Sequence, residues 1–139
     1  MITARVTEEL ITAEALAASV KSDTAGAVVT FSGDVRNHDK GKSVTTLNYE
    51  VHPSAQSVIE KIVNEIVSKH DVVNVAVAHR YGAIAIGESA FVVAVASAHR
   101  GPAFACCNEL VERVKAELPI WKYQEFADGT TEWVNSACA

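Results

Sequence analysis

The sequence lacks the features that mark secreted, membrane-spanning or disulfide-bonded proteins. Its three cysteines, at positions 106, 107 and 138, form neither a Cys-x-x-Cys pair nor an even disulfide set, so we expect reduced thiols. No apolar run approaches the roughly 20 residues that span a bilayer. The N-terminus also lacks the basic region, apolar core and cleavage site of a secretory signal. We therefore expect a cytoplasmic protein that binds no membrane.

Positive charge is scarce as well. Only 12 Lys and Arg residues stand against 17 Asp and Glu residues, which gives a net charge of −5. General nucleic-acid binding needs a basic face that releases counterions, so we expect no nucleic-acid partner. The few cations become informative where they cluster. At 139 residues, without internal repeats or low-complexity segments, the chain predicts a single domain over residues 1–139.

Three segments of the chain carry helix signals. Thr12 can cap a short helix over residues 13–20. Apolar residues recur at helical spacing over residues 58–67, with polar residues between them, as in a helix that covers a sheet. A third helix opens at Gly101-Pro102, because proline suits a first helical turn, and Pro119 ends it.

Strands are predicted between these helices. Residues 26–31 are apolar and β-rich throughout, which predicts a strand buried on both faces. Residues 44–51 predict another strand, and Asp128-Gly129 is a strong hairpin signal. One face of the strand at 44–51 should hold Thr45, Leu47, Tyr49 and Val51. The other expected strands are 2–6, 72–81, the long central 89–98, 123–126 and 131–134. The pattern indicates an α+β fold in which a mixed or antiparallel sheet packs with about three helices.

Polar residues 34–42 predict an exposed loop after the strand at 26–31, and this loop could act as a lid. Arg36 lies in it, at the end of a buried strand, where sites in mixed sheets often form. His38 is interpreted as an incidental loop histidine. His79-Arg80 is interpreted as a pair of strand-end residues beside the loop or short strand that Gly82 and Gly87 bracket.

The densest set of cations lies between Ser97 and Lys122. His99 and Arg100 stand where a strand hands over to a helix, and unpaired N–H groups at a helix start favour anions. Lys115 falls at the edge of the helix's apolar stripe, so its stem can lie in the core and its ammonium in a cleft. Lys122 follows seven residues later, beyond the proline, and could point into the same cavity. The apolar stripe of the helix that carries Lys115 comprises Cys107, Leu110, Val111, Val114 and Leu118. The alternative is that Lys115 and Lys122 are solvated surface lysines.

These motifs are specific in combination. They are Thr-Phe-Ser-Gly-Asp-Val-Arg-Asn-His at 30–38, Ser-Ala-His-Arg at 97–100, Lys115, and Pro-Ile-Trp-Lys at 119–122. In this order and spacing they resemble the large, catalytic subunit of molybdopterin synthase, the MoaE family, over residues 26–134. The resemblance implies an α/β-hammerhead-like fold.

The resemblance also implies a function. Such a subunit is a sulfurtransferase of molybdenum cofactor biosynthesis, which converts cyclic pyranopterin monophosphate (precursor Z) to molybdopterin by adding two sulfurs as a dithiolene. The sulfur arrives as a thiocarboxylate on the C-terminal Gly-Gly tail of a small ubiquitin-like partner. The step needs no metal and no cofactor. The implied assembly is a homodimer with one small subunit at each far end, a 2:2 heterotetramer.

Residue by residue, the resemblance assigns catalysis to two lysines. Lys115 would meet the partner's tail and polarise its acyl group, and Lys122 would act as general acid or base. His99 and Arg100 would hold the substrate's phosphate, because Arg can form two parallel hydrogen bonds to it. Arg36 would line the pterin side of the pocket.

The remaining substrate-binding candidates are less well defined. Asp34 and Val35 would line the pterin side together with the neighbouring arginine. The family usually has a basic residue and a glutamate after the Trp-Lys pair, whereas this chain has Tyr123 and Gln124. Contacts of these two residues with the substrate are therefore left open.

Other interpretations use the same residues. A non-catalytic module that binds a phosphorylated ligand or a partner's acidic C-terminal tail would need the cations but no reactive lysines, so lysine reactivity separates the two. A cysteine-dependent sulfurtransferase is disfavoured because Cys106 and Cys107 lie within a helix and not in a cationic loop. We expect Cys107 to pack in the core.

Assembly is suggested by apolar surface. The strand at 89–98, the Gly82–Gly87 segment and the C-terminal hairpin with Trp133 offer more apolar β-rich surface than three modest helices cover. We expect part of this surface to be an interface.

Overall fold

The computed structural model describes residues 1–39 and 41–135, and within them the chain forms two sheets and three helices. The first sheet has the strand order β1 (Ile2–Thr7), β5 (Asn74–Arg80), β7 (Ser89–Ser97), β2 (Ala27–Asp34). The second has the order β3 (His38–Asp39), β4 (Lys42–Val51), β8 (Ile120–Phe126), β9 (Thr131–Asn135), and β6 (Gly82–Ala83) pairs with β4. The helices are α1 (Ala13–Val20), α2 (Ala55–Val67) and α3 (Arg100–Glu117). The prediction of an α+β fold with three helices is confirmed.

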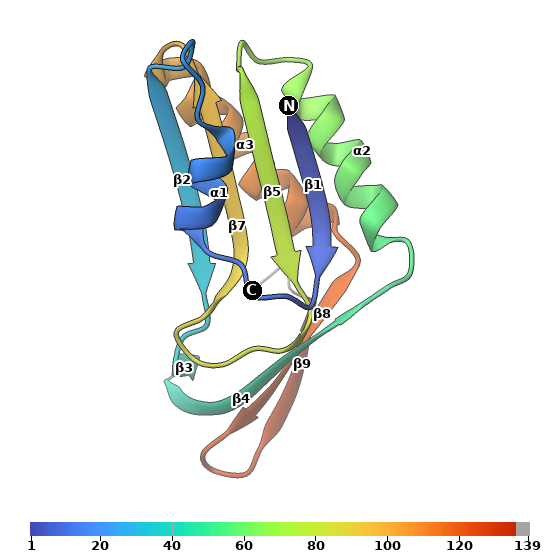
Figure 1. The fold of residues 1–139 in the computed structure, drawn as a ribbon. Helices are drawn as coiled ribbons and strands as arrows, with labels where there is room; N and C mark the ends of the chain where they lie inside the picture. The colour runs from blue at the N-terminus through green and yellow to red at the C-terminus, as the bar shows by residue number, and fades with distance from the viewer. Residues whose placement is uncertain (40, 136–139) are drawn as a thin grey trace.

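The first sheet is covered by helices on both faces. Figure 1 shows α1 in front of this sheet and α3 behind it, while the second sheet continues beyond its lower end. On β5 and β7, residues such as Val77 and Val93 point to the core shared with α2 and α3, whereas Ala78 and Ala94 point to α1. Successive side chains alternate across a strand, so the short residues let α1 approach closely on its own face.

The helix boundaries follow the local signals. Thr12 caps α1, since its hydroxyl accepts a hydrogen bond from the backbone N–H of Ala15. The helix covers the predicted range, residues 13–20. α3 begins at Arg100, just before Gly101-Pro102, and the chain returns as β8 directly after Pro119. No helix in the described residues is long and apolar enough to cross a membrane.

The hairpin prediction at Asp128-Gly129 is confirmed. β8 and β9 pair antiparallel, and Gly129 has φ of 85°, a conformation that side chains disfavour. Along β8 the side chains alternate between a buried face and an open one. Lys122 lies on the buried face.

Two strand predictions need correction. β2 is not buried on both faces, because it is an edge strand whose residues alternate between half-buried and exposed. Composition alone cannot distinguish an edge strand from a central one. On β4, a register shift between Val44 and Thr46 turns the chain, so Val44 is buried and Thr45 is exposed.

The predicted exposed loop at 34–42 is also wrong in part. β2 continues through Asp34, Val35 is buried, and β3 pairs back onto β4 with Asp39 opposite Lys42. The described part of this segment is therefore a short hairpin packed on the second sheet and not an open lid.

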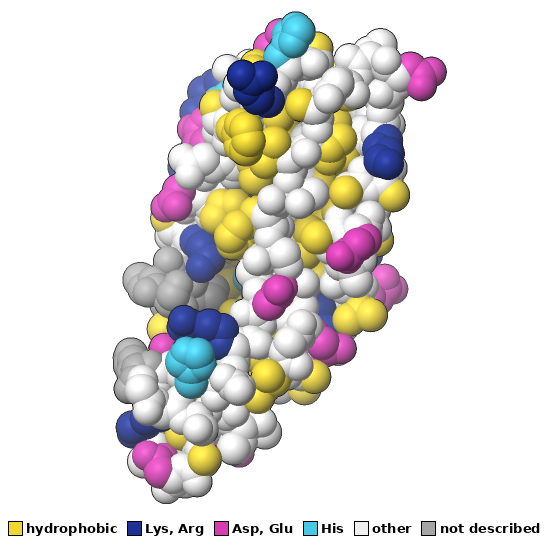
Figure 2. All heavy atoms as spheres, turned by 90° about the vertical axis from the view of Figure 1, so that its left-hand side faces the viewer, with side chains coloured by type: hydrophobic (Ala, Val, Ile, Leu, Met, Phe, Trp, Pro, Cys, Tyr) yellow, Lys and Arg dark blue, Asp and Glu magenta, His cyan; other side chains and the backbone are white. Residues whose placement is uncertain are grey.

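The apolar surface also differs from expectation. β7 is paired on both sides and buried, so it offers no apolar edge. The exposed apolar side chains include Val28 on β2, Phe104 on α3 and Trp133 on β9. Figure 2 looks onto the β2 side and shows hydrophobic side chains gathered over the upper part of this face. Cys107 is buried as expected, and Cys106 is buried beside it, while Cys138 lies outside the described residues.

Candidate active site

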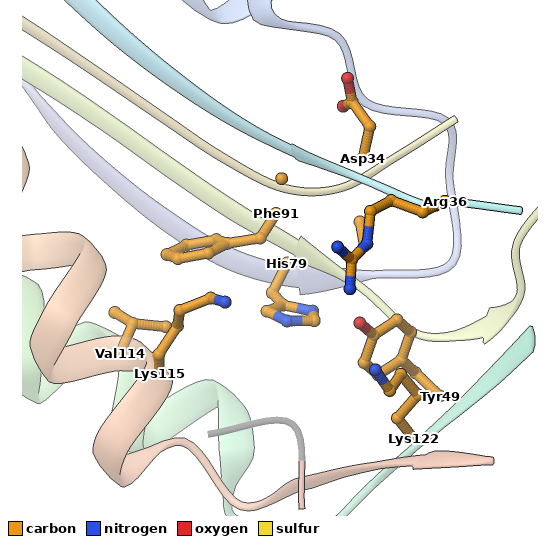
Figure 3. Close-up of a pocket in the computed structure, with 10 residues that line it drawn as sticks. Asp34, Arg36, Tyr49, His79, Phe91, Val114, Lys115 and Lys122 are labelled. Atoms are coloured by element: carbon orange, nitrogen blue, oxygen red, sulfur yellow. The ribbon is translucent and has the colours of Figure 1, made fainter. Parts of the chain in front are cut away.

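A cavity of about 250 Å³ lies where the first sheet, the end of α3 and the second sheet meet. β2, β5 and β7 contribute strand-end residues to it, α3 contributes its last turns, and β4 and β8 close the other side. Its lining comprises Gly33, Asp34, Arg36, Tyr49, His79, Ala90, Phe91, Val114, Lys115 and Lys122. Figure 3 draws the lining residues as sticks and labels eight of them.

The two lysines predicted to share a cavity do share this one. Lys115 lies in the last turns of α3, and Val114 beside it is buried, so the Lys115 stem runs along the core edge. Pro119 ends the helical segment, and β8 then carries Lys122 inward from the opposite side. In Figure 3 the two side chains come from different elements and reach the same space.

Lys122 is the more deeply placed of the two. Its side chain is only 11% exposed, and this burial lowers the pKa of its ammonium from the ordinary value. Asp39 acts against that effect by raising the Lys122 pKa, while Arg36 lowers it further. A lysine with a lowered pKa can exchange a proton closer to neutral pH than a solvated one.

His79 forms the floor between the lysines. Its ring is stacked on Phe91 with centroids 5.3 Å apart, and Tyr49 meets it edge-on at 5.2 Å. Nδ1 donates a hydrogen bond to the backbone oxygen of Arg80 at 2.8 Å, which leaves Nε2 as the acceptor of the neutral ring. Burial lowers the pKa of His79 to about 4. In Figure 3 the Lys115 side chain points toward this ring.

Burial also raises the pKa of Tyr49 to about 12, so its phenol stays protonated. The aromatic group of Tyr49, His79 and Phe91 is therefore uncharged at neutral pH. It gives the cavity an uncharged aromatic wall beside its cationic groups.

Three predicted substrate-binding residues lie at the end of β2. Arg36 lines the cavity, with its guanidinium turned inward in Figure 3. Asp34 also lines it, but its carboxylate accepts hydrogen bonds from the hydroxyls of Ser32 and Ser89, and these bonds lower its pKa. In Figure 3 its side chain points away from the lysines. Val35 is buried against Leu47, Ile84 and Ala90 and borders a smaller recess.

This adjoining recess of about 60 Å³ shares four residues with the main cavity, namely Asp34, Arg36, Tyr49 and Lys122. Asp39 and Gln124 line it as well. Gln124 is buried, and its amide nitrogen donates a hydrogen bond to Asp39 Oδ2 at 2.7 Å. Gln124 therefore contacts the wall of the site, whereas Tyr123 on the opposite face of β8 packs against Trp133, with ring centroids 4.9 Å apart.

His99 and Arg100 are not brought to this cavity within one chain. They stand at the start of α3, exposed to solvent, and no cavity described above includes them. Lys115 lies fifteen positions after Arg100 on α3, which corresponds to about 22 Å along the helix at 1.5 Å per residue. Phe91 likewise lies near the start of β7, whereas His99 lies beyond its end, directly before α3.

Three residues of the site were not assigned by sequence reasoning. Tyr49 was placed on a strand face only, His79 at a strand end, and Asp39 in an exposed loop. Alternation along β4 and β5 could have indicated that Tyr49 and His79 face the same side as the core, but no local signal brings Asp39 beside Lys122. Among the described residues, no group of three or more His, Cys, Asp or Glu side chains could hold a metal ion.

Comparison with known proteins identifies the family of the chain. The MoaE protein family profile matches residues 6–117. The molybdopterin synthase catalytic subunit of Thermoplasma volcanium is 36% identical over 129 residues, which cover 92% of this chain and 94% of that protein. The rat protein of the same name is 39% identical over 115 residues, or 82% of this chain, but it is longer, and the match spans 58% of its length.

A solved structure shares the fold. The crystal structure of molybdopterin synthase from Staphylococcus aureus superposes with a TM-score of 0.83 at 32% identity, covering 92% of this chain and 93% of that one. The resemblance drawn from the motifs is thereby confirmed. The chain belongs to the MoaE family, the catalytic subunits of molybdopterin synthase.

Proposed function

We propose that this chain, as one domain over residues 1–139, is a sulfurtransferase that makes molybdopterin from cyclic pyranopterin monophosphate. The sulfur would come from the thiocarboxylate at the C-terminal Gly-Gly tail of a small ubiquitin-like subunit. The observation that carries this proposal is the convergence of Lys115, Lys122 and Arg36 on one cavity with a neutral aromatic wall. A cytoplasmic location is part of the proposal.

The charges of the cavity suit the reactants. A cyclic phosphate, an incoming thiocarboxylate and the carboxylate left after sulfur transfer are all anions. Fixed cations in a partly closed cavity stabilise such charges more strongly than cations in water do. Because the cations are already in place, they need little rearrangement during the reaction. The uncharged aromatic wall formed by Tyr49, His79 and Phe91 suits the planar part of a pterin, which can pack against aromatic rings.

The two lysines are given different roles. Lys115, at the helix end, would meet the partner's tail and polarise its acyl group. Lys122, with its lowered pKa, would act as general acid or base while the phosphate ring opens and sulfur adds. Arg36 would line the pterin side, with Asp34 and Val35 supporting the strand end that carries it.

His99 and Arg100 of a second copy of the chain are proposed to bind the substrate's phosphate. If both lysines and both of these residues serve one substrate, the distance along α3 requires that they come from different chains. The proposed homodimer would supply this arrangement, and exposed apolar residues on β2 and α3, such as Val28 and Phe104, offer surface for it. One small subunit on each copy would give the 2:2 heterotetramer.

The deciding experiment is reconstitution. The purified chain is incubated with the thiocarboxylated small subunit and cyclic pyranopterin monophosphate, and the dithiolene product is measured. We expect product only when all three components are present. If the chain binds the pterin and the small subunit but forms no product, it is a binding module and the proposal is overturned.

Assembly is tested in parallel by sedimentation. We expect the chain alone to be a dimer, and addition of the small subunit to give a 2:2 complex that loses affinity when the terminal glycines are removed. A monomer at micromolar concentration would contradict this part of the proposal.

A further inference from the structure

Asp39 lies at the centre of a charged cluster beside the cavity. Its carboxylate oxygen Oδ1 is 3.6 Å from a terminal nitrogen of Arg36, and Oδ2 is 4.0 Å from the ammonium of Lys122. Gln124 donates its amide hydrogen bond to the same Oδ2 at 2.7 Å. Three side chains thus converge on one carboxylate, Arg36 from the segment after β2 and both Lys122 and Gln124 from β8.

The two cations differ in how far they depend on this contact. The Arg36 side chain is 66% exposed, so water screens its charge and the ion pair contributes little energy. The Lys122 side chain is 11% exposed and that of Asp39 is 19% exposed, so their attraction is screened much less. The charge of Asp39 therefore acts mainly on Lys122.

Gln124 determines where the carboxylate sits. It is almost fully buried on the inner face of β8, two residues after Lys122 and on the same side of the strand. A buried amide has few orientations that satisfy its hydrogen bonds, so its bond to Oδ2 fixes Asp39 relative to β8. The pairing of β3 with β4 holds the Asp39 backbone from the other side.

We propose that Asp39 is a positioning residue of this active site: fixed by Gln124, its carboxylate holds the Lys122 ammonium against one wall of the cavity and partly balances its charge. The effect of Asp39 on turnover rests on the proposed function, whereas its contacts with Lys122 and Gln124 are present in the chain without substrate or partner. Asp39 is a positioning residue and not a catalytic one, because it acts through Lys122.

This arrangement has a consequence for protonation. The charged groups around Lys122 are Asp39 on β3, Arg36 after β2, Lys115 on α3 and Glu132 on β9, and Tyr49 lies opposite it on β4. Burial, Arg36 and Lys115 lower the Lys122 pKa, whereas Asp39 and Glu132 raise it, Asp39 being the larger of the two. Removal of the Asp39 charge should therefore lower the pKa of Lys122 further.

The first test measures the free chain. The titration of Lys122 is followed by NMR of protein labelled at the lysine Cε, with its signal assigned from a Lys122→Arg variant. In Asp39→Asn, which keeps the shape and can still accept the bond from Gln124, we expect the midpoint to move to lower pH. Asp71→Asn removes one carboxylate from an exposed site on the segment between α2 and β5, and it should leave the midpoint unchanged.

A double variant makes the test independent of any general effect of the substitution. Asp39→Asn combined with Gln124→Glu exchanges the carboxylate and the amide across the same hydrogen bond. The charge returns to almost the same place, so the Lys122 midpoint should return toward the wild-type value. A midpoint that does not move in Asp39→Asn, or that is not restored in the double variant while melting shows a folded protein, overturns the proposal.

Turnover supplies the second measurement. In the reconstituted reaction, the pH at which Asp39→Asn loses half its kcat should shift in the same direction as the NMR midpoint, with the double variant again reversing the shift. The titration needs neither substrate nor partner. An NMR shift without any product formation would therefore support the role of Asp39 and count against the proposed function alone.

Discussion

Lys115 and Lys122 face one cavity from opposite sides, although the first lies on a helix and the second on the strand that follows it. Pro119 makes this possible, because it ends the helical segment and sends the chain back across the second sheet. A change of either lysine should therefore affect the same reaction.

Substitution of either lysine is the most direct test of the site. Lys115→Ala and Lys122→Ala should each lower turnover by at least ~100-fold, the usual scale for the loss of a positioned acid, base or charge. Lys21→Ala, on the exposed turn after α1, is the matched control and should keep wild-type turnover. Near-wild-type rates in both site variants, with normal melting curves, would remove the lysines from the mechanism.

His79 should make stability depend on pH. The pKa of His79 is about 4 in the fold and about 6.5 in an unfolded chain, so between these values only the unfolded state binds the proton. The free energy of unfolding should therefore fall by roughly 1 to 2 kcal/mol as pH drops from 6.5 to 5. Asp34, whose pKa is lowered from 3.8, contributes only at lower pH.

The measurement is urea unfolding at several pH values in this window. His79→Phe keeps an aromatic ring between Tyr49 and Phe91 but cannot bind a proton, so its stability should change much less between pH 6.5 and 5. An equal slope in the wild type and the variant would show that His79 is not held neutral by burial.

The cysteines should prove dispensable for chemistry. Burial raises the pKa of Cys106 and of Cys107 to about 11, so both remain thiols at neutral pH and make poor nucleophiles. Cys106→Ala and Cys107→Ala should keep turnover within about twofold and lower the melting temperature, because each leaves a small cavity under α3. A large loss of activity in a variant that folds cooperatively would revive the cysteine-dependent mechanism.

The sequence predicted those parts of the site that depend on local order. The spacing of Lys115, Pro119 and Lys122 indicated that the two lysines could share a cavity, because the helix edge, the break and the strand are consecutive. The Thr12 cap and the Asp128-Gly129 hairpin were predictable for the same reason.

Contacts across the sheets were not predictable in this way. The side chains of Asp39 and Gln124 meet only because β3 folds back onto β4 and β4 pairs with β8. Strict alternation along β4 assigns Thr45 to the buried face, but the register shift after Val44 buries Val44 and leaves Thr45 exposed. β7 carries Phe91 to the cavity near its start, and His99 and Arg100 follow its far end. Only the length of β7 in the structure shows that these two residues lie away from the cavity of their own chain.

The division of the proposed site between two copies can be tested by mixing inactive chains. The Lys115→Ala chain lacks the lysine of its own cavity. The Arg100→Ala chain lacks the arginine that would complete the cavity of the other copy. Each variant alone should be nearly inactive, because every site in its homodimer lacks one group. In a mixed dimer, the Arg100→Ala chain keeps Lys115 and receives Arg100 from the other copy, which gives one complete site.

Random exchange of equal amounts would make about half of the dimers mixed, and half of their sites complete, so roughly a quarter of wild-type activity should return. The control is a mixture of Lys115→Ala with Lys122→Ala, in which each chain lacks one lysine of its own cavity. If those two residues belong to one site within one chain, the mixed dimer contains no complete site and activity should stay low. Recovery in the control, or no recovery in the first mixture despite dimer exchange, would show that Arg100 does not complete the partner's site.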